Sequence, residues 1–248
     1  MEFALVLTLG LVAGTLGGVV GFGTSIMLMP ALVLVFGPLE AVPIMAVASI
    51  MANASRVAAW WSEIDWRAVA AYSVTGFPAA ALGAATLLVL PMRAVEAVLG
   101  AFFIAMIPVG RWMAQREWHL RLPHLALIGA GIGFLTGIVA STGPINAPFF
   151  LAYGLVKGAY LGTEAMGSIA VFVAKAITFR TLGALPFDTI GKGLITGSSL
   201  MAGAFIAKRY VRQLDAGRFR LLMDGLLLVA GLAMLWAAAA GPAAPLLE

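Results

Sequence analysis

Gly14–Ser25 reads GTLGGVVGFGTS and interrupts an otherwise apolar stretch near the start of the chain. A second glycine-rich stretch, Gly133–Pro144, reads GFLTGIVASTGP and occupies the corresponding place in the second half. A proline follows each of them, at Pro30 and Pro148. Glycine reaches backbone conformations that other residues avoid, and proline lacks the amide hydrogen that a helix interior needs. The two stretches therefore predict two interrupted helices, with the first break centred on Gly21–Thr24.

The composition points to a membrane protein. Of 248 residues, 62% are hydrophobic and only 10% are charged, with a mean hydropathy of +1.03, whereas soluble domains carry about 25% charged residues. Apolar runs of about 20 residues recur along the whole chain, which is the length that spans a bilayer. Runs such as Leu226–Ala240 lack the period-two alternation of a transmembrane β-barrel. We therefore predict an all-α polytopic membrane protein.

Several classes of site are excluded or disfavoured. The chain has no cysteine, which excludes disulfides, thiolate nucleophiles and cysteine-bound metals. His119 and His124 lie five residues apart in a polar linker, so they are predicted to be solvated residues and not metal ligands. The net charge of +4 lies mostly in loops, where it favours membrane anchoring over nucleic-acid binding. We expect no cofactor, no metal and no nucleic-acid partner.

The two halves repeat. Gly14 and Gly133 are separated by 119 positions, and the same separation relates Ser49 to Ser168 and Arg56 to Lys175. Each half has about five hydrophobic segments in the same order. The predicted organisation is a first transmembrane repeat, a cytoplasmic linker, a second transmembrane repeat and a tail, at residues 1–113, 114–124, 125–240 and 241–248.

Each half also contains a short apolar piece, Ser25–Phe36 or Ile145–Leu155. A helix of about 12 residues covers roughly 18 Å, which is short of the ~30 Å hydrocarbon core. The first piece ends at Gly37-Pro38. These pieces are predicted to be half-helices, and the sequence leaves open whether they span fully or are re-entrant.

Loop charge predicts the orientation. Basic residues gather in Arg111–Pro123 and in Lys208–Arg220, and an even number of apolar segments separates the two loops. The positive-inside rule places both in the cytoplasm, with both termini outside. Five segments in each half then make the repeats inverted, with broken or half-helices at the repeat interface. We expect a multi-pass protein of the cell membrane, specifically a bacterial inner membrane.

The interruptions suit a small anion. The first amide hydrogens of a helix lack partners within it, and the helix dipole adds positive potential there. Hydroxyl and amide side chains beside the breaks add donors. The alternative is that small residues only let helices pack closely, which we favour for Gly76, Gly83, Gly100, Gly193, Gly197, Gly203 and Gly231. The predicted substrate-binding residues are Gly21, Gly23, Thr24, Ser25, Asn53, Arg56, Ser141, Thr142, Gly143, Asn146 and Lys175.

Arg56 and Lys175 are cations inside apolar spans. A cation near the bilayer centre costs roughly 2.5–3.5 kcal/mol on insertion scales, and a bound anion would offset that cost. Either side chain could instead snorkel to the headgroups. Asn53 lies one turn before Arg56 on the same face, in a ligating or a structural role.

Two carboxylates have competing explanations. Glu164 follows Thr163 at the start of the predicted span Thr163–Leu182, so favourable charge at a helix N-terminus is the simpler account. Asp224 lies four residues after Arg220 and can pair with it. Both are proton-carrier candidates if transport is coupled to protons.

The pattern Gly14-x-x-x-Gly18-x-x-Gly21-x-Gly23 with Pro30, repeated in weaker form after Gly133, resembles the TauE/SafE family of sulfite exporters. The resemblance extends over roughly residues 3–240. It implies a multi-helix permease for sulfite, sulfonates or related anions, driven by ion gradients without ATP hydrolysis. The chain departs from the family pattern at Gly23-Thr24-Ser25, where hydroxyls replace glycines, and at Ala140.

The sequence therefore predicts a secondary transporter that moves a small anion by alternating access, with a proton or cation as a coupling partner. A passive anion channel is the alternative from a second class. A membrane-embedded enzyme is disfavoured because histidine lies in a loop and cysteine is absent. Oligomerisation is not predicted.

Overall fold

A computed structural model describes residues 2–20, 24–114, 120–139 and 142–210, together with residues 224–225, 228–229, 231–232, 235–236 and 238–239. Its helices and one short 3-10 turn are α1 (Glu2–Val20), α2 (Thr24–Trp60), η1 (Trp61–Glu63), α3 (Trp66–Val89), α4 (Met92–Ala114), α5 (Leu122–Ile138), α6 (Gly143–Ala152), α7 (Lys157–Thr181) and α8 (Phe187–Tyr210). The prediction of an all-α protein is confirmed for the described residues. The basic stretch 211–220 and half of the last predicted span, 221–240, lie outside them.

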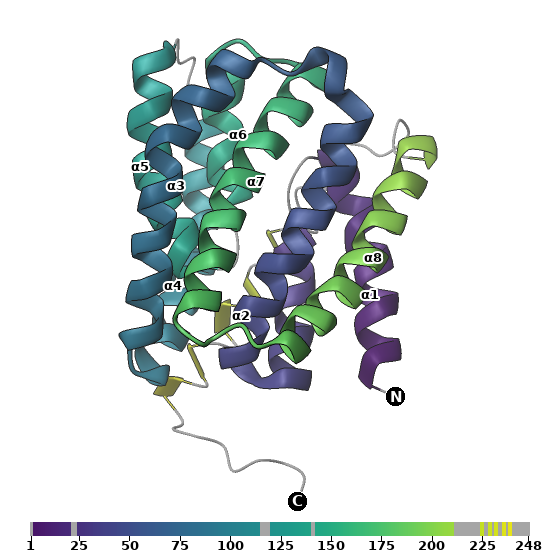
Figure 1. Ribbon diagram of the computed structural model, residues 1–248, viewed down its shortest axis with the longest axis vertical. Coiled ribbons are helices and arrows are strands. Elements are labelled where there is room, and N and C mark those ends of the chain that lie inside the picture. Colours follow the sequence, from purple (N-terminus) through teal and green to yellow (C-terminus); the bar gives the residue numbers. More distant parts are fainter. Residues whose placement is uncertain are drawn as a thin grey trace, which may run out of the picture.

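The central helices of the bundle are α2 and α7, which pack against each other (Figure 1). On one side α3 lies along α5, and on the other α1 lies along α8. α2 also contacts α8, and α7 contacts α3. The central pair therefore joins two outer helix pairs and has access to residues from both halves of the chain.

Described helices lie on either side of both predicted interruptions. α1 ends at Val20 and α2 begins at Thr24, while α5 ends at Ile138 and α6 begins at Gly143. Residues 21–23 and 140–141 lie outside the described residues. The second interruption is confirmed, since Val139 has an extended backbone after α5 and Thr142 is non-helical before α6. The first falls on residues outside the described ones and stays a prediction.

The predicted half-helices are present. Gly37, with φ 76° and ψ 160°, separates residues 24–36 from the rest of α2. α6 has only 10 residues and is followed by Gly154 at φ 104°. Glycine is the residue that adopts a left-handed conformation at low cost, so both short helices end where the sequence allows a sharp change of direction.

Part of each glycine-rich stretch is continuous helix, which corrects the view of these stretches as breaks throughout. Gly14 lies inside α1, where an added Cβ would lie 2.2 Å from the carbonyl oxygen of Leu200 on α8. Gly133 lies inside α5, where a Cβ would lie 2.4 Å from the carbonyl oxygen of Gly76 on α3. These glycines let two backbones touch, which is the common role of small residues between membrane helices.

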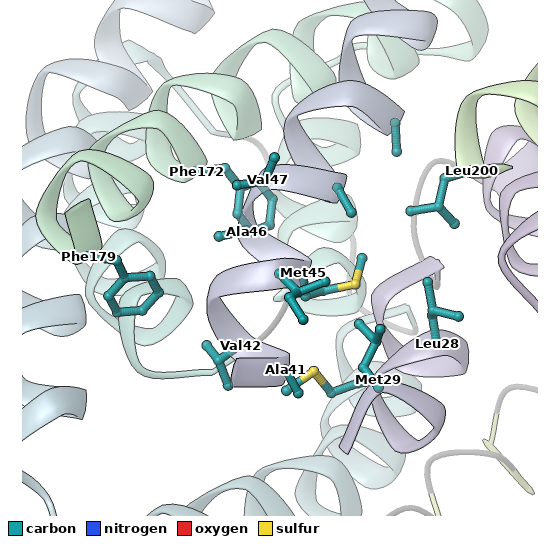
Figure 2. Close-up of a cluster of buried hydrophobic side chains, with 14 of the residues drawn as sticks. Leu28, Met29, Ala41, Val42, Met45, Ala46, Val47, Phe172, Phe179 and Leu200 are labelled. Atoms are coloured by element: carbon teal, nitrogen blue, oxygen red, sulfur yellow. The ribbon is translucent and has the colours of Figure 1, made fainter. Parts of the chain in front are cut away.

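Apolar side chains fill the space around α2. Leu28 and Met29 on its half-helix meet Val42 and Met45 on its long part, and Phe172, Phe179 and Leu200 approach from α7 and α8 (Figure 2). A second cluster includes Tyr72, Phe150 and Val171, between α3, α6 and α7. Close packing on both sides holds the half-helix of α2 and the short α6 against the centre of the bundle.

Among the residues that the structure describes, three helical stretches are long and apolar enough to cross a membrane, namely residues 40–63, 66–89 and 158–181. Large apolar side chains such as Val74 and Leu82 on α3 and Leu127 on α5 are exposed. Such an outer surface suits lipid and not water.

α7 begins at Lys157, six residues before the predicted start at Thr163, because the polar residues in its first turns do not stop the helix.

Candidate functional site

A polar cavity with a volume of about 30 Å³ lies where α2, α3, α5, α6 and α7 meet. That is space for roughly two water molecules or for one compact ion. Most of its lining side chains carry hydrogen-bonding groups, which is unusual inside an apolar bundle. The lining residues are Thr24, Ser25, Ser49, Asn53, Arg56, Tyr72, Thr136, Thr142, Gly143, Glu164, Ser168, Val171 and Phe172.

The structure brings most of the predicted binding residues to this cavity. Those that line it are Thr24, Ser25, Asn53, Arg56, Thr142 and Gly143. Asn146 is buried and contacts a lining carboxylate, whereas Lys175 is not among the lining residues. Gly21, Gly23 and Ser141 lie outside the described residues.

The first residues of both half-helices lie at the cavity. Thr24 begins α2, and Gly143 begins α6. Thr142 caps α6, and its carbonyl oxygen accepts from the amides of Ile145 at 2.9 Å and Asn146 at 3.0 Å. The positive ends of two helix dipoles therefore meet at one polar space, which favours a negatively charged occupant.

Hydroxyl groups pair across the cavity wall. The Oγ atoms of Ser25 and Ser49 are 3.4 Å apart, and the hydroxyls of Thr136 and Thr142 share a hydrogen bond. Each hydroxyl can rotate to donate to a neighbour or to an ion. The wall can therefore offer several donors over a short range without a change of fold.

A buried ion pair joins the two halves of the chain at this cavity. Arg56 Nη1 lies 2.8 Å from Glu164 Oε2, and the two side chains are 12% and 3% exposed. Arg56 Nη2 also donates to Asn53 Oδ1, while Asn53 Nδ2 donates to the carbonyl of Ser49 at 2.8 Å. Arg56 therefore points into the protein, and the snorkelling alternative is wrong for it.

Glu164, named from the sequence only as a proton-carrier candidate, also lines the cavity, although it was not among the predicted binding residues. It lies two turns inside α7, so its assignment to a helix N-terminus was wrong. Its Oε1 accepts from Ser168 Oγ at 2.8 Å and from Asn146 Nδ2 at 3.2 Å. A carboxylate seven residues inside an apolar helix was the available signal, because such a charge needs a buried partner.

The cavity is also lined by polar residues that were not among the predicted binding residues, namely Ser49, Tyr72, Thr136 and Ser168. For Ser49 and Ser168 a signal was present, since the two serines occupy the same position in the two halves. The repeat therefore carried information about the site and not only about the fold.

Lys175 has a different environment from the one predicted. Its side chain is completely buried, and Nζ donates to the carbonyl oxygens of Thr136 at 2.7 Å and Val139 at 2.8 Å. These carbonyls lie at the C-terminal end of α5, where the helix dipole is negative. Snorkelling is therefore wrong for Lys175, and its ammonium group stabilises the end of the interrupted helix.

The other charged and histidine residues that the structure describes do not line the cavity. Arg111 Nε donates to Asp224 Oδ2 at 2.9 Å, which links α4 to the last part of the chain. His124 Nδ1 accepts from the amide of Arg121 at the start of α5. Arg220 and His119 lie outside the described residues.

Comparisons with known proteins agree with this picture. The profile of the family described as Sulfite exporter TauE/SafE matches residues 6–234. The chain is also similar to the "Probable membrane transporter protein y4hK" of Sinorhizobium fredii (strain NBRC 101917 / NGR234), with 31% identity over 218 residues, which are 81% of this chain and 85% of the relative. No solved structure gives a significant match.

Proposed function

The chain belongs to the TauE/SafE sulfite exporter family of membrane transporters, and from this membership and the cavity we propose that it is a secondary transporter of a small anion, working by alternating access across the cytoplasmic membrane. The proposed cargo is sulfite, an organosulfonate or a related small anion. The proposed binding residues are those of the polar cavity.

The observation that carries this proposal is the meeting of three anion-favouring elements in one small space. Two half-helices begin at the cavity, the guanidinium of Arg56 lies in its wall, and hydroxyls surround both. A compact oxyanion needs several donors at short range, and a planar guanidinium can bind two of its oxygens at once. A volume of about 30 Å³ leaves room for a compact ion.

The helix contacts support an inverted-repeat arrangement. A shift of 119 residues relates α1 to α5 and α3 to α8. Under that relation, the pair α1 and α8 corresponds to the pair α5 and α3, and both pairs are in contact. The contact between α2 and α8 likewise corresponds to that between α7 and α3.

Such an arrangement gives the protein two outer units on either side of one central cavity. Alternating access in transporters with inverted repeats is largely a rocking of one unit against the other around a fixed site. The glycine-mediated backbone contacts within each outer pair suit movement of that pair as a rigid body.

Ligand binding tests the proposal directly. Purified full-length protein is heated with sulfite, thiosulfate, methanesulfonate, acetate or chloride, and the midpoint of unfolding is recorded. A ligand of the folded state raises the midpoint as its concentration exceeds Kd. We expect a shift with sulfite or methanesulfonate that is larger than with chloride at the same ionic strength.

Uptake into proteoliposomes then separates a carrier from a channel. A carrier saturates with substrate and catalyses counterflow, in which internal unlabelled anion drives entry of labelled anion. Non-saturating flux without counterflow indicates a channel. The absence of both binding and flux for every anion in the panel contradicts the proposed function.

A further inference from the structure

The buried charges around the cavity form a nearly balanced set. In the described part of the chain, Glu164 and Lys175 are the fully buried charged residues, and Arg56 is close to buried. Lys175 is held by backbone carbonyls at the end of α5. Arg56 and Glu164 both line the cavity, whereas Lys175 does not, so their ion pair is the charged group in the cavity wall.

The carboxylate of Glu164 already has the hydrogen-bond partners that an oxyanion needs. Its Oε2 accepts from Arg56, and its Oε1 accepts from Ser168 and Asn146. The donors come from α2 in the first half of the chain and from α6 and α7 in the second half. In this structure Glu164 thus holds the guanidinium in the way that a bound anion would.

Resting on the transport function proposed above, we propose that the substrate anion replaces Glu164 on Arg56, and that Glu164 then takes up one proton, so that each monovalent anion crosses the membrane together with one proton. The proton comes from water on the side to which the cavity is open. An O–H bond forms on the Glu164 carboxylate as its ion pair with Arg56 opens. On the other side the anion leaves, the O–H bond breaks, the proton returns to water and the ion pair forms again.

Electrostatics gives the reason for the coupling. A buried carboxylate that loses its cation is very costly to keep charged, and it becomes neutral by protonation instead. The empty cavity then holds Arg56 and an ionised Glu164, while the loaded cavity holds Arg56, the anion and a neutral Glu164. Both states carry the same net charge, so neither exposes an unpaired charge to the low-dielectric interior during reorientation.

An unpaired hydrogen-bond acceptor beside Glu164 supports the loaded state, in which Glu164 is protonated. Asn146 is 2% exposed, and its Oδ1 atom has no hydrogen-bond partner in the structure, although its Nδ2 donates to Glu164 Oε1. A protonated Glu164 carries a donor in place of an acceptor. Rotation of the Asn146 amide would turn Oδ1 toward that donor and satisfy it.

The other groups that face Glu164 do not offer a competing charge. Arg56 on α2 forms the ion pair with Glu164. The hydroxyls of Tyr72 on α3 and of Tyr160 on α7 also interact electrostatically with Glu164. α6 contributes the neutral amide of Asn146. Among the described residues the ionic partner of Glu164 is therefore Arg56, and loss of that partner decides its protonation.

The test uses full-length protein in proteoliposomes, with labelled sulfite and methanesulfonate as probes. Methanesulfonate is the sharper probe because it stays a monovalent anion throughout the working pH range. For the wild type we expect the labelled anion to accumulate inside when the outside is more acidic. An internal pH dye should report uptake of one proton per methanesulfonate. An imposed membrane potential should not change the uptake.

The variant Glu164→Gln keeps a neutral side chain of the same shape. We expect acid-driven accumulation by this variant to fall to the level of protein-free vesicles, because the empty carrier would return with the charge of Arg56 unpaired. Counterflow should continue, because the bound anion still balances the charge of Arg56 in the loaded carrier. The matched control is Glu63→Gln, which removes an exposed carboxylate on η1 and should leave both measurements unchanged. Glu164→Asp should retain coupling at a reduced rate.

The outcomes separate the two proposals. If Glu164→Gln still accumulates the probe in response to acid, the coupling role of Glu164 is overturned and the transport function stands. If Glu164→Gln does not fold, the wild-type stoichiometry decides, since methanesulfonate entry without proton uptake overturns the coupling. If the wild type moves neither probe, the proposed function fails and the coupling with it.

Discussion

The ammonium group of Lys175 lies 2.8 Å from the carbonyl oxygen of Val139, the C-cap residue that follows α5. A helix that stops inside a membrane leaves carbonyl groups without partners, and no water is available there to satisfy them. Lys175 supplies donors from a neighbouring helix. A buried cation therefore makes the second helix interruption possible, next to a cavity suited to anions.

Removal of this cation should destabilise the fold. Lys175→Met leaves the carbonyls of Thr136 and Val139 unsatisfied, with an expected loss of about 1–3 kcal/mol for each group. Thermal unfolding in detergent measures the change. Lys192→Met is the control, since its ion pairs with Glu40 and Asp188 are partly exposed and weak. Equal stability of the two variants would contradict the proposed role.

The Arg56–Glu164 pair should behave as one unit. Arg56→Met leaves a buried carboxylate unpaired, and we expect a loss of about 3–5 kcal/mol in stability together with loss of anion binding. In the double variant Arg56→Met/Glu164→Met, both charges are absent, so stability should largely return while binding stays absent. Denaturant unfolding and the anion-dependent thermal shift measure the two effects. Additive stability losses would show that the two residues do not interact.

Hydroxyls of the cavity should contribute to anion affinity. Replacing a neutral hydrogen-bond donor costs about 0.5–1.5 kcal/mol, or roughly two- to tenfold in Kd. We expect weaker binding of this order for Ser25→Ala and for Thr142→Val, measured by titration of the thermal shift. Ser198→Ala, on an exposed part of α8, is the matched control. Unchanged Kd in both cavity variants would place the anion elsewhere.

Two glycines on α5 allow a paired test of helix packing. Gly133→Ala places a Cβ 2.4 Å from the carbonyl oxygen of Gly76, so α3 and α5 must separate and the protein should be destabilised. Gly131→Ala meets nothing within 4 Å and should raise stability by about 0.5–1 kcal/mol through helix propensity. The unfolding midpoints of the two variants, taken side by side, check the contact. A tolerated Gly133→Ala would mean that the two backbones are not in contact.

The predicted orientation can be tested because the chain has no cysteine of its own. Ser62 is exposed on η1, and Thr181 is exposed at the end of α7. Two helices, α3 and α4, separate η1 from the linker predicted to be cytoplasmic, whereas α8 alone separates Thr181 from the second basic loop, so the predicted orientation places Ser62 in the cytoplasm and Thr181 outside. In intact cells, a membrane-impermeant maleimide should label Thr181→Cys and not Ser62→Cys, and disruption of the membrane should expose both. The reverse pattern would invert the assigned topology.

Local features of the sequence were enough to predict the membrane class and the helix interruptions. The low charge and the repeated apolar runs indicate a lipid-embedded helical protein, because only helices and closed barrels satisfy their backbone in lipid and these runs lack the alternation of a barrel. Gly37 ends the first half-helix, as its position before Pro38 suggested. The half-helices begin at Thr24 and Gly143, within the predicted breaks. The membrane class and the positions of the helix ends depend on residues that are close together in the sequence.

The meeting of buried charges was decided by the tertiary structure alone. Arg56 and Glu164 are 108 positions apart, and they pair because α2 and α7 pack together at the centre of the bundle. Lys175 was grouped with Arg56 by the repeat, yet it faces the end of α5 and not the cavity. Sequence periodicity identifies which side of a helix is buried, but the partner across the interface depends on how distant helices pack, and that arrangement determines whether a buried charge binds a ligand, a carboxylate or a helix end.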